Sequence, residues 1–340
     1  MVVKYRSAVS DPRCLPGGGP QGTLLGLLLF IILINDLGFD DQSNEVGEII
    51  TCKRRIKELN LLHLKFVDDF SIAEAVNMRK QLSMLPVDSR PQPDNYHDRT
   101  GHTLEPRNSR VYSQLVQTEK YAAKHKMKIN YKKTKLMLFN PGQAMDFHPR
   151  FQLGGHSIEM VEESKLLGVI IRSDLSWSSN TNYMVARANR KLWFLRRLKA
   201  LGANKDDLKE VYIKQIRSIL EYAAPVWHSS LTLEDSRQIE RVQKSAIKII
   251  QGQRYQSYTA ALSHMHLEAL YTRRNELCRK FARKCWRSNK FNNWFKCDNR
   301  VTITRQQNKK LCEVFSRTLR YEKSPISYFT KLLNKAGNLI

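Results

Sequence analysis

The chain has 340 residues, of which 41% are hydrophobic and 26% are charged. This composition excludes wholesale disorder and low-complexity sequence, and the length suffices for about two domains. The six cysteines include no CxxC pair, which favours free thiols in a reducing compartment. The longest apolar stretch, residues 24–34, is too short to span a membrane, and the first residues do not resemble a signal peptide. We therefore expect an intracellular protein, nuclear or cytoplasmic, that is not secreted and has no membrane partner.

The charge is strongly positive and unevenly distributed. The chain has 57 Lys and Arg against 32 Asp and Glu, a net charge of +25, and residues 187–340 hold 33 of the basic and 12 of the acidic residues. A surface of that sign attracts polyanions. Because the basic residues are spread over several predicted helices, nucleic acid is favoured over an anionic membrane surface. A solvated basic surface without a partner remains the alternative.

The first third of the chain predicts a loop, an apolar helix and an acidic turn. Residues 16–22 contain four glycines and two prolines and must form a loop, and an apolar helix is expected over residues 23–37, after a possible short strand over residues 2–10. Apolar and polar residues alternate over residues 62–67, which predicts a strand that ends in a tight turn. A second strand or a helix start is expected at residues 70–73.

After a proline-rich loop over residues 86–108, the pattern predicts a helix and then further strands. A helical face extends from about residue 109 to residue 126, and residues 127–139 predict a hairpin around a lysine-rich turn. Residues 151–161 predict two strands that turn at a Gly-Gly pair, and residues 166–171 predict another β-branched strand.

The hydrophobic period changes from two to 3.6 after Trp177, which predicts helices for the rest of the chain. The first helix has Leu192, Leu195 and Leu198 on one face. The second is capped by Asn204, and the third ends at Gly252. A fourth is indicated by apolar spacing at Leu267, Leu270, Leu277, Phe281 and Cys285. The whole pattern predicts an α+β fold.

Two adjacent carboxylates, Asp68 and Asp69, follow the strand at residues 62–67. Neighbouring like charges repel unless a cation lies between them, so an exposed pair on a tight turn suits a divalent metal ion. Further motifs elsewhere in the sequence support the interpretation of this pair as a metal site. Four segments in order resemble the palm motifs of reverse transcriptases: GGGPQG at 17–22, FVDD at 66–69, NYKKTK at 130–135 and LLGV at 166–169.

Within that group, the chain is similar to the RNA-directed DNA polymerases of non-LTR, LINE-like retrotransposons, in which the LINDL sequence at residues 33–37 is also familiar. The resemblance implies two-metal nucleotidyl transfer with Mg²⁺ or Mn²⁺. Asp68 would be a direct metal ligand, and Asp69 a weaker ligand or an electrostatic partner. The template and the incoming nucleotide would lie against Gly18, Gly19, Pro20, Gln21 and Gly22.

The resemblance also assigns the later motifs. Lys133 would neutralise the departing pyrophosphate, with Lys132 and Lys135 as competing candidates, and Leu167 and Gly168 would form a tight turn that positions the primer. The expected partners are an RNA template and a DNA primer, or an RNA/DNA duplex, together with deoxynucleotides. The duplex phosphates would lie along Arg187, Arg190, Lys191, Arg196 and Arg197.

One part of the family pattern is missing from this sequence. The family has another metal-binding aspartate on a strand upstream of the glycine loop, whereas only sixteen residues precede Gly17, with Asp11 as their one carboxylate. We therefore expect an N-terminally truncated reverse transcriptase that is catalytically incomplete as an isolated chain and would need the missing N-terminal part of the polymerase. The alternatives are a non-catalytic, basic nucleic-acid-binding module and an element remnant.

These expectations define three regions. Residues 1–177 would form a partial palm, an antiparallel sheet with packed helices that lacks the fingers and the first palm strand. Residues 178–252 would form a helical thumb, and residues 253–340 a basic helical extension.

Overall fold

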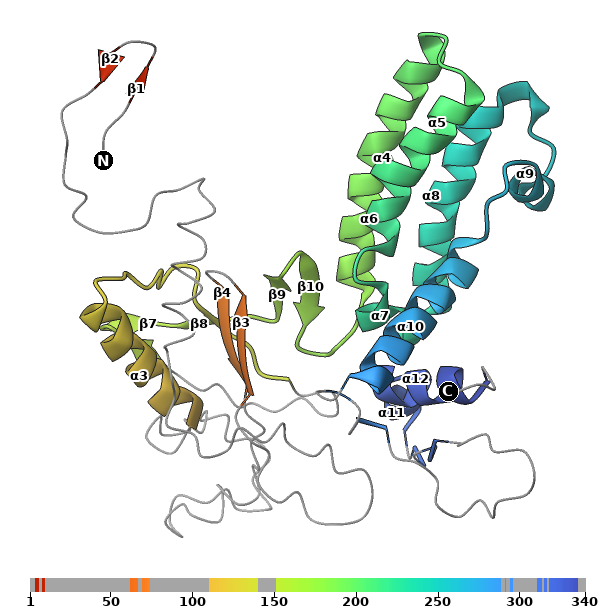
Figure 1. Cartoon of the computed structure of the whole chain (residues 1–340). Helices are drawn as coiled ribbons and strands as arrows, with labels where there is room; N and C mark the ends of the chain where they lie inside the picture. The colour runs from red at the N-terminus through yellow and green to blue at the C-terminus, as the bar shows by residue number, and fades with distance from the viewer. Residues whose placement is uncertain are drawn as a thin grey trace, which may run out of the picture. The chain divides into compact units, whose positions relative to one another are not determined.

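The structure is a computed structural model that describes residues 4–5, 8–9, 62–66, 69–73, 110–139, 151–288, 291, 294–295, 311–313, 315–316 and 318–335 (Figure 1). Helices predominate in this part of the chain and small two-stranded sheets accompany them, so the fold is α+β at a coarse level. The described residues fall into two compact units. One extends to Val161, and the other comprises residues 137–139 and everything from Glu162 onward.

The first unit contains one described helix and short strand pairs. Its elements are β1 (Lys4–Tyr5), β2 (Ala8–Val9), β3 (Leu62–Phe66), β4 (Asp69–Ala73), α3 (Arg110–Lys124), β5 (Lys135–Leu136), β6 (Gln152–Leu153), β7 (His156–Ser157) and β8 (Glu159–Met160). The pairs β1–β2, β3–β4 and β6–β7 are antiparallel, and β5 pairs with β8 in parallel. A small core forms where Phe151, Leu153 and Ile158 pack against α3.

The hairpin predicted for residues 127–139 is wrong. The amide of Met127 donates to the carbonyl of Ala122 and closes the end of α3, and the carbonyl of Asn130 accepts from the amides of Lys133 and Thr134. These local turns use the backbone groups that a first strand would need. The second predicted strand is formed only as β5, which pairs with β8 instead.

The second unit begins with a hairpin and continues as helices. Its elements are β9 (Glu163–Leu166), β10 (Val169–Arg172), α4 (Ser178–Ala200), α5 (Lys205–Val211), the π-helix η3 (Tyr212–Arg217), α6 (Ser218–Glu221), α7 (Ala224–Trp227), the 3₁₀ turn η4 (His228–Ser230), α8 (Leu233–Gln251), the 3₁₀ turn η5 (Gly252–Arg254), α9 (Tyr258–His264), α10 (Leu270–Arg287), α11 (Leu319–Glu322) and α12 (Pro325–Lys335).

The two long helices α4 and α8 lie side by side and run in the same direction (Figure 1). At their first turns, the Ser178 hydroxyl donates to the Asp235 carboxylate over 3.1 Å, and at their last turns Lys199 donates to the carbonyl of Ile249. The antiparallel helix from α5 through η3 to α6 completes the bundle. Its core contains fully buried side chains from all three helices, among them Leu195, Leu208, Tyr212, Ile216, Ile239 and Ile247.

The helix ends follow the capping signals of the sequence. The Asn204 side chain accepts from the amide of Asp207 at the start of α5, and Gly252 ends α8 with φ +59°, so both sequence predictions are confirmed. Thr232 and Asp235 form a reciprocal capping box at the start of α8.

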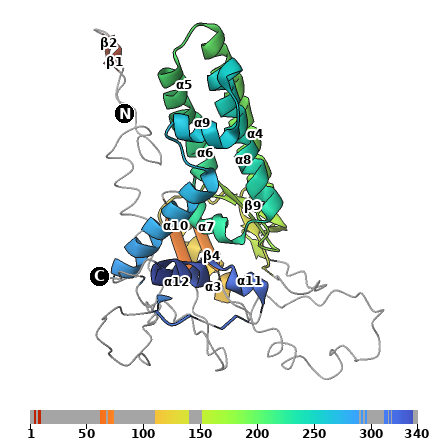
Figure 2. The ribbon, with the colours of Figure 1, turned by 90° about the vertical axis from the view of Figure 1, so that its right-hand side faces the viewer.

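A second, smaller core joins α10 to α12 (Figure 2). The ring of Phe281 meets that of Phe329 edge-on at 5.7 Å, and the buried Cys278 and Cys285 lie in the same cluster. Burial raises the pKa of the Cys278 thiol to about 12, which keeps it protonated and unreactive at neutral pH.

Candidate nucleic-acid interface

The first two predicted motifs lie mostly outside the described residues. Gly18, Gly19, Pro20, Gln21, Gly22 and Asp68 are not among them, and Asp69 is described only as the first residue of β4, opposite Phe66 in the ladder. The expected strand before the acidic pair is therefore confirmed, and of the two alternatives left open after it, a strand or a helix start, the structure has the strand β4, which begins at Asp69. The metal-binding roles of Asp68 and Asp69 remain predictions.

The lysine-rich motif forms a turn in the first unit. The amide of Lys133 donates to the carbonyl of Asn130 at 3.0 Å and to its Oδ1 at 3.2 Å, while the Lys133 side chain is exposed. Lys135 forms an ion pair with Glu159 on β8. This pairing leaves the exposed Lys132 and Lys133 as the better candidates for binding an anion.

The turn that the resemblance implies at Leu167 and Gly168 is present, so the single strand expected over residues 166–171 is wrong: β9 ends at Leu166 and β10 begins at Val169. Leu166 and Val169 face each other at the end of the β9–β10 ladder, and the two residues between them have φ +47° and +86°. Two successive positive φ values are typical of a type I′ hairpin turn, which matches the twist of its strands. Gly168 suits such a position, whereas Leu167 adopts it at a cost of about 1 kcal/mol or more.

Tyr222, which lies between helices α6 and α7, hydrogen-bonds to this turn. No pattern in the sequence indicated a role for this residue. Its hydroxyl donates to the carbonyl of Leu167 at 2.8 Å, and its own carbonyl accepts from the indole of Trp227 at 2.9 Å. Tyr222 itself is fixed at a sharp break between α6 and α7, where Ala223 has φ +52°. A sequence signal for this contact does not exist, because 55 residues separate the two partners.

The solvent side of α4 carries six basic residues and no carboxylate. Lys199 is engaged with the carbonyl of Ile249. The other five, Arg187, Arg190, Lys191, Arg196 and Arg197, are exposed and form no ion pair with any residue of the described part of the chain. Arg187, Arg190, Lys191 and Arg197 lie within about 120° of one another around the helix, and Arg196 lies to one side of them. We call the exposed surface of α4 that carries these five residues the α4 face.

Aromatic side chains interrupt the basic residues of the α4 face. Trp193 is 63% exposed and Phe194 is 43% exposed, although such side chains are usually buried. Trp193 lies three residues after Arg190 and four before Arg197, which places all three on neighbouring positions of the helix surface. An exposed aromatic ring among unpaired guanidinium groups is suited to phosphates and to base or sugar faces together.

The hairpin adjoins the α4 face through Tyr183. Lys165 of β9 donates to the Tyr183 hydroxyl at 2.7 Å, and the Arg187 guanidinium lies 5.4 Å from the centre of the Tyr183 ring. The hydrogen bond from Lys165 and the charge of Arg187 lower the pKa of Tyr183. Lys165 of the β9–β10 hairpin therefore lies next to the basic α4 face.

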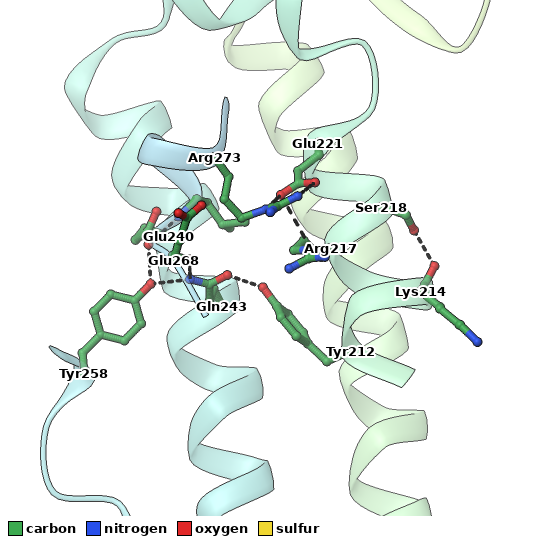
Figure 3. Close-up of polar contacts among 11 residues, drawn as sticks. Tyr212, Lys214, Arg217, Ser218, Glu221, Glu240, Gln243, Tyr258, Glu268 and Arg273 are labelled. Atoms are coloured by element: carbon green, nitrogen blue, oxygen red, sulfur yellow. Dashed lines mark hydrogen bonds and ion pairs between the residues drawn. The ribbon is translucent and has the colours of Figure 1, made fainter. Parts of the chain in front are cut away.

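A polar network links the helices of the bundle (Figure 3). Gln243 accepts from the hydroxyl of Tyr212 and donates to the hydroxyl of Tyr258 at 2.7 Å and to the carbonyl of Glu268 at 3.0 Å. Burial raises the pKa of both tyrosines, so both remain neutral donors. In the same close-up, Arg273 donates to Glu221 over 3.0 Å and ties α10 to α6.

The described residues show neither a metal cluster nor a membrane span. Within them, no three His, Cys, Asp or Glu side chains gather where they could hold an ion. No helix in these ranges combines the length and the apolar character needed to cross a bilayer. Comparisons of the chain with protein-family models, with curated proteins and with solved structures found no match.

Proposed function

We propose that the helical second unit binds the primer–template duplex as the thumb of a reverse transcriptase, and that the chain is part of an RNA-directed DNA polymerase of the LINE-like kind. The α4 face is the observation that carries this proposal. Five exposed cations without a carboxylate partner give affinity for phosphates, and Trp193 and Phe194 give contacts that tolerate any sequence.

The order of the four palm-like motifs supports the polymerase assignment. In this proposal Asp68 and Asp69 hold Mg²⁺ or Mn²⁺, Lys133 neutralises pyrophosphate, and the glycine loop lies against the template. The Leu167–Gly168 turn supports the primer, since it adjoins the α4 face and exposes 43% of the Leu167 side chain. A bound metal ion would stabilise the attacking and leaving oxygens of nucleotidyl transfer.

Duplex binding tests the interface. The double variant Arg190→Ala with Arg197→Ala removes two cations from the α4 face, and each lost phosphate contact should lower the slope of log K against log salt by about 1. Fluorescence anisotropy with a labelled poly(rA)/oligo(dT) duplex over a salt series measures both the affinity and the slope.

Arg241→Ala is the matched control. Arg241 is an equally exposed arginine of α8 that forms an ion pair with Glu234, so its removal changes the net charge without touching the α4 face. The loss of duplex affinity per substituted arginine is compared between the two variants. If it is no larger for Arg190 and Arg197 than for Arg241, the α4 face is not the interface.

Primer extension tests whether the chain is catalytically incomplete. Synthesis on the same duplex with Mg²⁺ or Mn²⁺ that Asp68→Asn abolishes would show an active polymerase and overturn that expectation. Salt-dependent duplex binding without synthesis fits both a polymerase fragment and the alternative, a non-catalytic nucleic-acid-binding module, which the α4 face supports equally.

A further inference from the structure

A groove of about 430 Å³ lies along α8, away from the residues that define the α4 face. On α8 it is lined by Ser236, Arg237, Glu240 and Lys244, which recur at intervals of one to four residues and share one side of the helix. Thr232 lines one end, so the groove follows about 18 Å of helix axis up to Lys244. Such a groove is long and open enough for an extended chain.

The groove presents two cationic side chains that form no ion pair within the described part of the chain. Arg237 and Lys244 are exposed and form no ion pair with the described residues. Glu240 is the one carboxylate among the lining residues, and it accepts from the amide of Leu270 at 3.1 Å and from the Tyr258 hydroxyl. The two lysine and arginine charges outnumber this single carboxylate, so the groove has a net positive charge.

A buried arginine adds to this charge from behind the groove wall. Arg274 is fully buried, and its Nε donates to Nδ1 of His228 at 3.2 Å while its Nη2 donates to the Ser236 hydroxyl at 2.9 Å. Its Nη1 has no hydrogen-bond partner among the described residues, and no carboxylate of that part of the chain bonds to the guanidinium. Both of its partners, His228 and Ser236, line the groove.

Three tyrosine rings also line the groove, beside the apolar Leu231, Leu233 and Ala269, and the Lys244 ammonium lies over the Tyr258 ring, 5.0 Å from its centre. Tyr258, Tyr271 and Tyr328 come from α9, α10 and α12, and Tyr271 is 56% exposed. The His228 ring meets Tyr271 edge-on at 5.4 Å and Tyr328 at 6.0 Å, which holds the tyrosines in place. In the wall, the Ser229 hydroxyl is buried and has no hydrogen-bond partner among the described residues.

We propose that this groove binds a short stretch of single-stranded nucleic acid, with its phosphates near Arg237 and Lys244 and its bases against the tyrosine rings. A positively charged groove that offers aromatic faces at intervals is the arrangement by which proteins bind single strands without reading their sequence. An acidic peptide would satisfy the cations but not the three rings. The choice of nucleic acid as the ligand rests on the proposed function. The single strand would bind in this groove, and the duplex on the α4 face.

The test uses a fluorescein-labelled oligouridylate of ten nucleotides and the full chain. Tyr271→Ala should weaken its binding about tenfold, whereas Tyr271→Phe, which keeps the ring, should bind as the wild type does. Arg237→Ala should weaken binding and lower its salt slope, and Arg241→Ala, four residues along the same helix but outside the groove, is the control for charge. Because Tyr271 and Arg237 are exposed, thermal melting should show these variants folded.

Photocrosslinking locates the ligand directly. An oligomer that carries 4-thiouridine should crosslink to peptides containing Tyr258, Tyr271 or Tyr328, as mapped by mass spectrometry. The inference is overturned if Tyr271→Ala and Arg237→Ala bind the oligomer as the wild type does, if the crosslinks fall on α4, or if poly-glutamate binds in place of RNA. Loss of duplex binding in the variant that lacks Arg190 and Arg197, with oligouridylate binding intact, shows that the two surfaces are separate.

Discussion

Arg274 of α10 is a buried charged side chain that the apolar spacing of this helix does not predict. The apolar spacing of residues 267–285 predicted Leu277 and Phe281 on the inner face of a helix, but Phe281 is 41% exposed. The side chains of α10 that are buried are Leu270, Arg274, Cys278, Ala282 and Cys285. Arg274 occupies a core position because Ser236 and His228 accept from its guanidinium, and the sequence does not reveal those partners.

His228 is expected to make the protein acid-sensitive. Its Nδ1 accepts from Arg274 and its Nε2 lies 3.0 Å from Oδ1 of Asn275, and burial together with the Arg274 charge lowers its pKa to about 4. The unfolded state takes up a proton near pH 6.5 and the folded state only near pH 4. The free energy of unfolding should therefore fall by up to about 1.4 kcal/mol per pH unit as the pH drops through this window.

Urea unfolding at several pH values between 7 and 5 measures this effect above the range in which most carboxylates titrate. The variant His228→Asn keeps an acceptor for Arg274 but does not titrate, so its slope of stability against pH should be flatter than that of the wild type. Equal slopes for the two proteins would show that His228 is not buried in neutral form.

At the scale of elements, the β9–β10 turn shows how a local signal and a distant contact combine. The apolar pattern predicted one strand over residues 166–171, and only the resemblance implied a tight turn at the Leu-Gly pair. What fixes the turn in space is Tyr222, whose ring would lie 3.3 Å from a Cβ on Gly168 and whose hydroxyl binds the Leu167 carbonyl.

Gly168→Ala should destabilise the protein more than Gly202→Ala does. The two glycines have nearly the same φ, +86° and +88°, but a Cβ on Gly202 would meet no atom within 4 Å. The Gly202 change therefore reports the backbone cost alone, about 1 kcal/mol, and the Gly168 change adds the contact with Tyr222. Denaturant unfolding measures both, and a Tyr222→Ala background should remove the difference. If both changes lower the free energy of unfolding equally in the wild-type background, a Cβ at position 168 does not clash with Tyr222.

In α4, the buried leucines and the exposed basic residues follow the sequence pattern, but the exposure of two aromatic side chains does not. Its Leu192 and Leu195 are buried as their spacing predicted, and its basic residues are exposed. Trp193 and Phe194 were not singled out in the sequence, because an aromatic pair in an amphipathic helix usually belongs to the core. Only their exposure in the folded unit identifies them as part of a binding surface.

At the scale of the whole molecule, the two units have cores of very different size. The bundle core of the second unit contains buried side chains from α4, α5, η3, α6, α8 and α10, whereas the described core of the first unit consists of Phe151, Leu153 and Ile158 with partly buried neighbours. Stability follows the buried apolar area, so local opening should cost less free energy in the first unit.

Native-state hydrogen exchange should show this difference. Amides in the middle of α4 and α8 should exchange about 100-fold or more slowly than those of α3, because opening free energies range from near zero to the global value within one protein. Measurement by mass spectrometry at neutral pH resolves these helices as separate peptides. Equal protection of α3 and α8 would contradict the ranking of the two cores.

The sequence by itself determined the helices α4, α8 and α10 and the helix from α5 to α6, the caps at Asn204 and Gly252, and the strand β3, because periodicity and capping act over a few residues. It also located the basic half of the chain. The tertiary structure alone decided that β5 pairs with β8, that Tyr222 holds the turn, and that Arg274 lies buried beside His228. Each of these contacts joins residues 24 to 55 positions apart, and no local pattern specifies such a pairing.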